Sequence, residues 1–326
     1  MPAEARAFWV ARRGAGEIRP VRLPEPGPDE VRVRTLHTAI SRGSESVVFR
    51  GGVPESQRQR MRAPFQEGDF PGPVKYGYLN VGVVEAGFAP LCGRTVFCLY
   101  PHQTRYVVPA TAVTAVPDGV PADRAVLAGT VETAINLAWD ARVWIGQRIA
   151  VVGAGMVGAC VARLLAGIPG TQVTLVDVEP SRAGLAESLG VGFALPAEAP
   201  GGRDLVVHAS AAAAGLQLSL ELLAAEGTVW DLSWYGDRQV SLALGGAFHA
   251  GRLAIRSSQV GTVAGVQRSR RTSADRLALA LDLLRDPAYD AIITGRSPFA
   301  ELPEVLSDIA AGRRPGLCEV IDYPPR

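Results

Sequence analysis

The sequence predicts an α/β protein in which a β-rich N-terminal block precedes a doubly wound parallel sheet. Three observations lead to this fold class. A short apolar run of strand length ends at Gly153 in a glycine-rich turn, and a helical pattern follows at once. A second apolar run then ends in an acid, Asp177. From there, apolar runs and helical patterns alternate as far as residue 257, which is typical of parallel strands joined by helices.

The glycine-rich turn has the spacing Gly-x-Gly-x-x-Gly. Gly153 permits a tight turn, Gly155 lets the backbone approach a pyrophosphate, and Gly158 lets helix and strand pack closely. The free N–H groups at the start of a helix attract phosphates, and Met156 and Val157 lie at this point. We therefore expect the turn to hold the phosphates of a dinucleotide in a Rossmann fold.

The acid at the end of the second apolar run is placed to select the cofactor. Residues 172–176 form this run, and Asp177 follows it, 24 residues after Gly153. Its carboxylate is expected to accept hydrogen bonds from the adenosine ribose hydroxyls, whereas a 2′-phosphate would meet its negative charge. NAD(H) is therefore favoured. Arg182 lies either against the adenine or beside a 2′-phosphate, which leaves NADP(H) as the alternative.

The composition is that of a globular protein with two domains. The chain has 326 residues, a hydrophobic fraction of 48% and a net charge of +1. It has no long basic run, so nucleic acid and anionic membranes are not expected partners. No apolar stretch reaches membrane-spanning length and the N-terminus lacks a signal-peptide segment, so we expect a cytoplasmic protein. The four cysteines are scattered, which argues against a zinc ribbon or a disulfide framework.

The part of the chain before residue 121 is expected to be mainly β-structure. Residues 1–30 have the pattern of a hairpin that turns at residues 14–16, and a stiff proline-rich loop follows. Residues 40–70 show little periodicity, and the Arg and Gln content of residues 57–62 suggests a solvated helix or loop near a cleft mouth. The remaining strands are expected at residues 31–38, 79–85, 94–100, 106–109 and 113–116.

The pattern changes after Pro121. Helices are expected over residues 122–128 and 133–143, with Glu132 and Thr133 between them. Further helices are expected at residues 183–189, 216–225, 274–284 and 301–310. Further strands are expected at residues 205–208, 227–232, 253–257 and 292–298.

Several polar and aromatic residues follow the strands of the predicted parallel sheet. Ligands of doubly wound sheets bind at the carboxyl ends of the strands. By this rule Ser210, Ser233, Trp234 and Gln259 converge on the cofactor edge, and Ser210, Ser233 and Gln259 are expected cofactor contacts. Trp234, with Tyr235, either covers a flat substrate ring or the nicotinamide, or packs against the other domain.

Three further segments carry a resemblance to a known family. Residues 42–51, 77–84 and 130–134 match, in order, the Cys-Gly-Thr-Asp-x-x-x-x-Arg-Gly, Gly-His-Glu-x-x-Gly-x-Val and Gly-Val-x-Thr-Ala segments of the medium-chain dehydrogenase/reductase family. Together with the glycine turn, they make nearly the whole chain resemble this family. The resemblance implies a GroES-like catalytic domain (1–129), a Rossmann domain (130–261) and a C-terminal segment (262–326) that returns to the catalytic domain. It also implies that Thr133 lies beside the nicotinamide.

The departures from the family pattern concern zinc. Where the family has zinc ligands, this chain has Arg42 for the Cys and Tyr78 for the His, with Leu79 for the adjoining Glu and Gly129 or Thr130 at the third ligand. An arginine does not give up its proton to bind a metal, and leucine has no donor atom. The four-cysteine structural zinc lobe is absent as well. We therefore expect a member without zinc, and its pattern resembles the subtype that includes a bacteriochlorophyllide hydroxyethyl dehydrogenase.

Organic side chains are then needed to stabilise charge on the substrate oxygen or to move a proton. Tyr78 stands at the lost His position, and a cation, Lys75 or Arg42, is expected to lower the pKa of its hydroxyl. Alternatively Tyr78 is a packed aromatic residue, and Arg42 pairs with Glu45 across a loop. The expected catalytic residues are Tyr78, Lys75, His102 and Glu45, and the expected substrate contacts are Arg42, Tyr100 and Trp234.

The sequence thus predicts a zinc-independent oxidoreductase that transfers a hydride between a nicotinamide cofactor and an alcohol or carbonyl carbon of a small molecule. One alternative is an NADPH-dependent enone or quinone reductase, and another is a non-catalytic dinucleotide-binding protein for redox sensing or assembly. The resemblance also implies a homodimer formed through the strand at residues 253–257.

Overall fold

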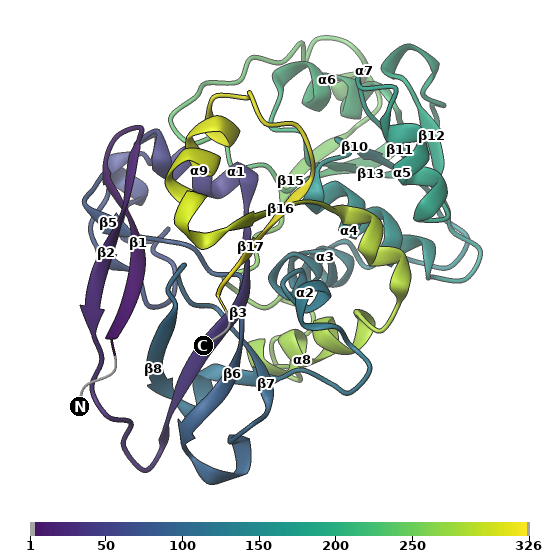
Figure 1. The fold of residues 1–326 in the computed structure, drawn as a ribbon. Helices are drawn as coiled ribbons and strands as arrows, with labels where there is room; N and C mark the ends of the chain where they lie inside the picture. The colour runs from purple at the N-terminus through teal and green to yellow at the C-terminus, as the bar shows by residue number, and fades with distance from the viewer. Residues whose placement is uncertain (1–3, 325–326) are drawn as a thin grey trace. The chain divides into compact units, whose positions relative to one another are not determined.

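The computed structural model describes residues 4–324, and Figure 1 shows the course of the chain. The chain divides into two compact units. Within the described residues, unit 1 contains residues 4–129, Leu281–Arg285 and residues 293–324, and unit 2 contains Thr130–Ala280 and Asp286–Ile292. Unit 2 holds a parallel sheet, and unit 1 holds sheets in which antiparallel pairs dominate. The predicted α/β class with a separate β-rich part is confirmed.

Unit 2 is organised around a six-stranded sheet in the order β12-β11-β10-β13-β14-β15. Every neighbouring pair in it is parallel. Numbered along the chain, the order is 3-2-1-4-5-6, so the winding reverses between β10 and β13, where ligands of such sheets bind. The strands are β10 (Arg148–Val152), β11 (Gln172–Val176), β12 (Gly192–Ala194), β13 (Arg203–His208), β14 (Leu223–Asp231) and β15 (Ala254–Ser257).

The core of unit 2 lies between this sheet and its helices. Strand β10 is buried from residue 149 to residue 152, because helices cover both faces of a parallel sheet. One core cluster joins Ala150, Val206 and Val229 of the strands to Leu216 and Leu220 of α6. The helices are α3 (Ala128–Ala141), α4 (Met156–Ala166), α5 (Arg182–Ser188), α6 (Ala213–Glu221), α7 (Ala247–Ala250) and α8 (Ser273–Leu283).

Unit 1 contains two sheets. The smaller has the order β2-β1-β5-β4, and the larger has the order β16-β17-β3-β6-β7-β9, with β8 also paired to β3. Figure 1 shows the yellow C-terminal strand β17 beside the purple β3, with which it pairs in antiparallel fashion. The larger sheet carries a core cluster of buried side chains that includes Val31, Val33, Val84, Val96 and Tyr106.

The predicted hairpin of unit 1 is confirmed by β1 and β2, and the strands predicted at residues 31–38, 79–85, 94–100, 106–109 and 113–116 by β3, β6, β7, β8 and β9. The strands of the unit are β1 (Glu4–Arg12), β2 (Ala15–Arg22), β3 (Glu30–Ile40), β4 (Glu67–Gly68), β5 (Val74–Lys75), β6 (Asn80–Gly87), β7 (Thr95–Cys98), β8 (Arg105–Pro109), β9 (Val113–Ala115), β16 (Ile293–Pro298) and β17 (Cys318–Asp322). Its helices are α1 (Arg42–Phe49), α2 (Ala122–Ala125) and α9 (Leu302–Ala310).

Helix α1 corrects the sequence prediction for residues 40–70. The last five residues of α1 are buried, and they include Glu45 and Ser46. An acid and a serine thus occupy inward-facing positions, which breaks the apolar periodicity that would have identified a buried helix. The sequence at residues 57–62 does form solvated turns, as predicted.

Other boundaries also differ from the prediction. Glu132 and Thr133 lie inside α3 instead of between two helices. The helix predicted over residues 216–225 ends at Glu221, because β14 already begins at Leu223. The short elements β12, β17 and α7 are missing from the sequence prediction. Over the described range, 4–324, no helix is both long enough and apolar enough to cross a bilayer.

Candidate functional site

The glycine turn of unit 2 joins β10 to α4. Gly153 has a φ of +110°, and a Cβ atom there would lie 2.7 Å from the backbone nitrogen of Ser210. A Cβ atom on Gly158 would lie 1.9 Å from the carbonyl oxygen of Gly153, so no larger residue fits. Gly155 differs, because a Cβ atom there would meet nothing within 4 Å. The first and third glycines close the turn, and the second leaves the approach to the start of α4 open, as a pyrophosphate requires.

Asp177 is attached to this turn by its carboxylate. It follows β11 directly, and its Oδ2 accepts a hydrogen bond from the N–H of Ala154 at 2.6 Å. Its Oδ1 accepts one from the N–H of Glu179 at 3.0 Å. Arg182 is the first residue of α5, and its backbone N–H bonds the carbonyl of Glu179 at 3.1 Å. The acid and the turn therefore form one structural unit, with an anion fixed where the ribose of a dinucleotide is expected.

The ends of β13 and β14 bring together two of the serines predicted from the sequence. Ser210 Oγ lies 2.7 Å from Nε2 of His208, and Ser233 Oγ lies 3.2 Å from Nδ1 of the same ring. His208 is fully buried, and its Nδ1 contacts Asp231 at 2.9 Å. Neither His208 nor Asp231 was among the predicted site residues. His208 ends one predicted strand and Asp231 is the last but one residue of another, so the rule that placed the serines at this edge also applies to them.

The acid of this cluster is ionised near neutral pH. Burial alone raises the pKa of Asp231, but hydrogen bonds from His208, the backbone of Ser233 and the hydroxyl of Tyr235 lower it below its usual value. Burial and the negative charge of Asp231 raise the pKa of Tyr235, so its hydroxyl stays protonated and donates to Asp231 at 2.9 Å.

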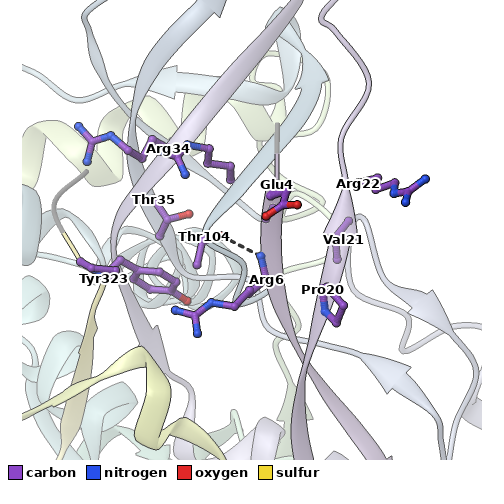
Figure 2. A pocket seen from close by; sticks show the side chains of 12 residues that line it. Glu4, Arg6, Pro20, Val21, Arg22, Arg34, Thr35, Thr104 and Tyr323 are labelled. Atoms are coloured by element: carbon purple, nitrogen blue, oxygen red, sulfur yellow. Dashed lines mark hydrogen bonds between the residues drawn. The ribbon is translucent and has the colours of Figure 1, made fainter. Parts of the chain in front are cut away.

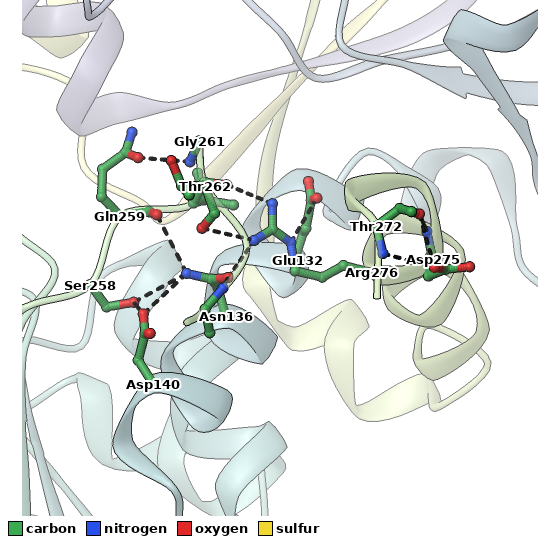
Figure 3. A network of polar contacts seen from close by, with 12 residues as sticks. Glu132, Asn136, Asp140, Ser258, Gln259, Gly261, Thr262, Thr272, Asp275 and Arg276 are labelled. Carbon is green, nitrogen blue, oxygen red and sulfur yellow. Dashed lines mark hydrogen bonds and ion pairs between the residues drawn. The ribbon is translucent and has the colours of Figure 1, made fainter. Parts of the chain in front are cut away.

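A second polar network of unit 2 fixes the loop that carries Gln259 (Figure 3). The buried guanidinium of Arg276 donates to Glu132 at 3.0 Å and to the carbonyl oxygen of Val260 at 2.5 Å, and it also bonds Asn136. Asn136 in turn donates to the carbonyl of Gln259 at 3.4 Å. Burial raises the pKa of Glu132, although Arg276 opposes the shift. The loop after β15 is thus held to helix α3 by buried charges.

Three further residues predicted for this unit lie in α3 and in the loops after β14 and β15. Gln259 is exposed, and its side chain accepts a hydrogen bond from the N–H of Gly261 at 2.8 Å. Thr133 is half-buried in α3, and Trp234 is half-buried in the loop after β14. Their contacts with cofactor or substrate stay predictions.

In unit 1, three of the four predicted catalytic residues belong to one network. The hydroxyl of Tyr78 lies 2.7 Å from Ser41 Oγ, and the N–H of Ser41 donates to Glu45 Oε1 at 2.8 Å. Glu45 Oε2 contacts Nε2 of His102 at 2.8 Å, and Nδ1 of His102 contacts Thr38 Oγ1 at 2.7 Å. Tyr78 is half-buried, whereas Glu45, His102 and Thr38 are buried. Ser41 and Thr38, which connect the network, were not predicted from the sequence.

The structure corrects the expected pKa of Tyr78. Burial raises the pKa of its hydroxyl, bonds to Ser41 and Ser44 oppose the shift, and the charge of Glu45 adds to it. A cation was expected to lower this pKa, but the partners of the hydroxyl are the hydroxyls of Ser41 and Ser44. The Tyr78 hydroxyl is therefore a hydrogen-bond donor at neutral pH and not a base.

The two cations expected beside Tyr78 are engaged elsewhere. Lys75 is fully buried; it pairs with Glu67 and donates to Gln103 at 2.8 Å. Burial lowers the pKa of Lys75, and Glu67 opposes the shift. The guanidinium of Arg42 donates to the carbonyl oxygen of Arg314. The carboxylate oxygens of Glu45 contact Ser41 and His102, and the alternative in which Arg42 pairs with Glu45 stays a prediction.

Tyr100, expected to contact the substrate, is part of an aromatic stack. Its ring lies parallel to that of Tyr106 at 3.9 Å, and Phe65 lies 5.3 Å away. The ammonium of Lys75 lies 5.2 Å from the centre of the Tyr100 ring. Only 6% of Tyr100 is exposed, so its role as a substrate contact stays a prediction.

Unit 1 also contains a cavity of about 620 Å³ (Figure 2). Arg6, Arg22, Arg34 and Arg105 line it. Arg34 and Arg105 share one carboxylate, that of Glu85, at 2.9 and 3.1 Å, so it balances one of these four positive charges. None of the residues predicted as catalytic, cofactor-binding or substrate-binding lines the cavity.

Within residues 4–324, no three His, Cys, Asp or Glu side chains come close enough together to hold a metal ion. At the two positions where the family pattern has Cys and His, Arg42 and Tyr78 donate hydrogen bonds to a carbonyl oxygen and to serine hydroxyls. Donors of this kind do not form a zinc ligand set.

No protein-family model matches the sequence, and no curated protein matches it either. The structure, in contrast, is similar to solved dehydrogenases over its whole length. L-idonate 5-dehydrogenase from Escherichia coli K-12 has a TM-score of 0.79 at 15% identity, covering 99% of both chains. A short-chain alcohol dehydrogenase from Escherichia coli CFT073, solved with NADH, has a TM-score of 0.77 at 16% identity, covering 98% of this chain and 100% of that one.

A protein from Sinorhizobium meliloti 1021 described as a zinc-binding dehydrogenase, solved with NADP, is similar to the same degree. Its TM-score is 0.76 at 18% identity, covering 98% of this chain and 99% of that one. At these identities the likeness establishes the fold. Unit 2 is a Rossmann nucleotide-binding fold and unit 1 is a GroES-like β-rich fold, as the sequence predicts.

Proposed function

We propose that the chain belongs to the medium-chain dehydrogenase/reductase family and transfers a hydride between a nicotinamide cofactor and an alcohol or carbonyl carbon of a small molecule, without zinc. The glycine turn carries the proposal. Gly153 and Gly158 stand where no larger residue fits, and Gly155 leaves the start of α4 open. The fold shared with solved dehydrogenases, of which one holds NADH and another NADP, supports it.

The residues of unit 2 have defined parts in this proposal. The N–H groups of Gly155, Met156 and Val157 at the start of α4 bind the pyrophosphate. Asp177 accepts from the adenosine ribose, and its fixed negative charge favours NAD(H) over NADP(H). Arg182 is the group that would hold a 2′-phosphate. When bound, the nicotinamide ring supplies the carbon that takes or gives the hydride.

On the substrate side, Tyr78 is the proposed hydrogen-bond donor to the reacting oxygen. Its pKa is raised, so the hydroxyl keeps its proton and stabilises negative charge that develops on the oxygen. Ser41 and Glu45 orient it from behind, and His102 holds Glu45. Zinc would act as a Lewis acid on the same oxygen in the metal-dependent relatives, and Tyr78 and Arg42 stand at two positions of its ligand pattern.

The cofactor site is tested by adding a methyl group to Gly155. A Cβ atom there meets no protein atom, so Gly155→Ala leaves the fold unchanged and blocks the approach of a pyrophosphate. We expect binding of NADH, followed by fluorescence titration, to weaken about tenfold or more, which corresponds to about 1.4 kcal/mol. The matched control is Gly184→Ala in α5, where a Cβ atom also meets nothing. Equal binding by both variants would remove the basis of the proposal.

The chemistry is tested with a panel of aldehydes and ketones. Chelator-treated protein is expected to oxidise NADH with at least one of them and to gain nothing from added zinc, while Tyr78→Phe turns over about a hundredfold more slowly at unchanged NADH affinity. Activity that appears only with stoichiometric zinc overturns the zinc-independent mechanism. Tight NADH binding without hydride transfer across the panel favours a redox sensor instead.

We also propose a homodimer that continues the sheet of unit 2 through β15. This strand is at the edge of the sheet, and Ile255, Arg256 and Ser257 are exposed. A charged residue on an edge strand discourages pairing, so Ile255→Lys is expected to give monomers in light scattering. Ile145→Lys, at an exposed isoleucine outside the sheet, is the control. Monomers of the unaltered protein at micromolar concentration would contradict the proposal.

A further inference from the structure

Three connected groups lie at the carboxyl edge of the parallel sheet. The proposed hydride transfer does not use them together. His208 ends β13, Asp231 ends β14, and the parallel register pairs them directly. The ring of His208 contacts Asp231 Oδ1 through Nδ1 at 2.9 Å and Ser210 Oγ through Nε2 at 2.7 Å. A carboxylate, an imidazole and a hydroxyl are therefore connected in sequence.

The contacts of Asp231 determine which ring nitrogen carries the proton. Asp231 also accepts hydrogen bonds from the N–H of Ser233 and from the hydroxyl of Tyr235, each at 2.9 Å. An ionised carboxylate only accepts, so Nδ1 of His208 donates to it. In the neutral imidazole Nε2 is then an acceptor, and the partner at 2.7 Å is the hydroxyl of Ser210. This is the direction of proton transfer that activates a serine.

Ser210 lies in a fixed and exposed turn between β13 and α6. The next residue, Ala211, has a φ of +51°, a left-handed conformation that is rare for alanine. Its N–H donates to Ser233 Oγ at 3.0 Å, and Arg238 donates to its carbonyl oxygen at 3.1 Å. The N–H of Ala212 donates to Ser210 Oγ at 3.3 Å. Ser210 is thus oriented by its neighbours while it remains accessible to solvent.

We propose that Ser210 is a base-activated nucleophile and that Ser210, His208 and Asp231 form an acyl-transfer site that hydrolyses small carboxylic esters. A nucleophile within hydrogen-bond distance of a base, with the base oriented by a third group, is the arrangement that such chemistry needs. The reaction requires only the ester and water, so it is independent of hydride transfer.

The steps balance without a further reagent. Ser210 Oγ forms a bond to the carbonyl carbon, and its proton moves to Nε2 of His208. The bond between that carbon and the alcohol oxygen then breaks, and the proton on Nε2 passes to the departing oxygen, which leaves as the alcohol. Water, deprotonated by Nε2, attacks the acylated serine in the same way. The acid is released, and the proton returns to Ser210.

Donors for the developing negative charge are also close by. Helix α6 has nine residues and begins at Ala213, and the first N–H groups of a helix have no partner within it. A Cβ atom on Gly215 would lie 2.3 Å from Ser210 Oγ and 3.1 Å from Nε2 of His208. The hydroxyl therefore lies against the first turn of α6, where N–H groups stabilise an oxyanion.

The experiment uses diisopropyl fluorophosphate, which needs no knowledge of the natural ester. Ser210 Oγ bonds to phosphorus, fluoride leaves, and the proton goes to His208. We expect the full chain to acquire one adduct, located on Ser210 by peptide mass spectrometry, and to hydrolyse p-nitrophenyl acetate. Ser210→Ala loses both, and Ser257→Ala, at another exposed serine, loses neither.

Two variants test whether the imidazole activates the serine. His208→Gln is expected to react about a hundredfold more slowly, the usual contribution of a general base. Because His208 is buried, Gly215→Ala is the second variant: it keeps all three side chains but places a methyl group where the Ser210 hydroxyl now lies. It should lose the adduct while its circular dichroism is unchanged. An adduct on Ser210 that forms at the same rate in both folded variants, or no adduct on the unaltered protein, overturns the proposal.

Saturating NADH separates this inference from the proposed function. Gly153 lies against the backbone of Ser210, so a dinucleotide on the glycine turn should slow labelling of Ser210. Unlabelled Ser210 with normal NADH binding removes the acyl-transfer site and leaves the oxidoreductase. Labelling that Gly215→Ala abolishes but NADH does not slow keeps the acyl-transfer site and counts against a dinucleotide on the turn.

Discussion

Two histidines of this molecule have the same kinds of hydrogen-bond neighbours. The residue that supplies the hydroxyl is buried in one case and exposed in the other. In unit 1, His102 lies between Glu45 at 2.8 Å and the hydroxyl of Thr38 at 2.7 Å. In unit 2, His208 lies between Asp231 at 2.9 Å and the hydroxyl of Ser210 at 2.7 Å. Both rings are almost completely buried, with exposed fractions of 1% and 0%.

The difference is at the hydroxyl end. Thr38 is buried, and its oxygen contacts the hydroxyl of Tyr323 at 3.2 Å; Tyr323 is itself largely buried and lines the cavity of unit 1. Ser210 is exposed at a strand end next to the glycine turn. A carboxylate, an imidazole and a hydroxyl thus make a buried network in unit 1 and an accessible site in unit 2. We expect changes to the buried network to reduce stability and changes at the exposed end to reduce reactivity.

The largest loss of stability is expected from a change at a buried cation of unit 2. Because this unit also holds the exposed Ser210, the change tests whether burial, and not the unit, determines the loss of stability. Arg276→Met removes the hydrogen bonds to Glu132 and Val260 and leaves the Glu132 carboxylate buried without its counter-charge. We expect the free energy of unfolding to fall by about 4 kcal/mol at pH 8. Denaturant unfolding of the full chain measures it, with Arg271→Met, at an exposed arginine, as the control.

The same variant has a predicted pH dependence. Burial raises the pKa of Glu132 above its unfolded value, and removal of Arg276 raises it further. A carboxyl with a raised pKa in the folded state favours folding at low pH and loses that contribution as the pH rises through the folded pKa. The gap between variant and unaltered protein should therefore narrow from pH 8 towards pH 5. A gap that widens in acid would show that Glu132 is not the group left unpaired.

The next effect tests the buried network of unit 1. Glu45→Ala removes the acceptor of both the N–H of Ser41 and the ring of His102, and these donors are left buried. We expect a loss of about 3 kcal/mol in the free energy of unfolding. Glu25→Ala, at an exposed acid paired only with Arg32 in the described chain, should change stability by less than about 0.5 kcal/mol. A Glu45 variant as stable as this control would mean that the network does not support the fold.

The sequence predicts the parallel sheet of unit 2 well, because its strands are continuous apolar runs and its glycines have one structural explanation. It fails at α1, where Glu45 and Ser46 face inward and break the periodicity. It also places the end of α6 too late, because leucines occur on both sides of Glu221, at 220, 222 and 223, and so continue into β14. Local pattern does not distinguish a helix end from a strand start when both are buried.

The candidate site also has one part that local sequence spacing predicts and one part that depends on the whole fold. Gly153 and Asp177 were predicted because their spacing along the chain determines their geometry. Glu45 and His102 were proposed separately, but their contact joins residues 57 positions apart, which no local pattern contains. The pairing of His208 with Asp231 needs the register of two parallel strands, and that register is set by packing of the whole sheet. Sequence therefore identified residue types at the edge, and only the fold assembled them.

Two smaller losses of stability allow a direct comparison of the two hydroxyl residues, Thr38 and Ser210. Thr38→Val removes the partner of Nδ1 of the buried His102 and the contact with the Tyr323 hydroxyl. We expect a loss of about 1.5 kcal/mol in the free energy of unfolding. Ser210→Ala is a change at an exposed residue, where water can take the place of the lost hydroxyl beside Nε2 of His208, so the loss should stay below about 0.5 kcal/mol. Denaturant unfolding of both variants decides the comparison, and equal losses would show that exposure does not separate the two networks.

The smallest change in stability is expected from Gly215→Ala, and it sharpens the comparison most. Alanine is the better helix former by about 0.5–1 kcal/mol within α6, but its Cβ atom would lie 2.3 Å from Ser210 Oγ. The serine side chain can rotate towards solvent, so the two effects largely offset each other and the net change should stay within about 0.5 kcal/mol. The rotation breaks the bond to His208, so reactivity with the fluorophosphate should be lost while the thermal midpoint is kept. A variant that loses stability but stays reactive would show that the bond between Ser210 and His208 supports the fold and does not activate the serine.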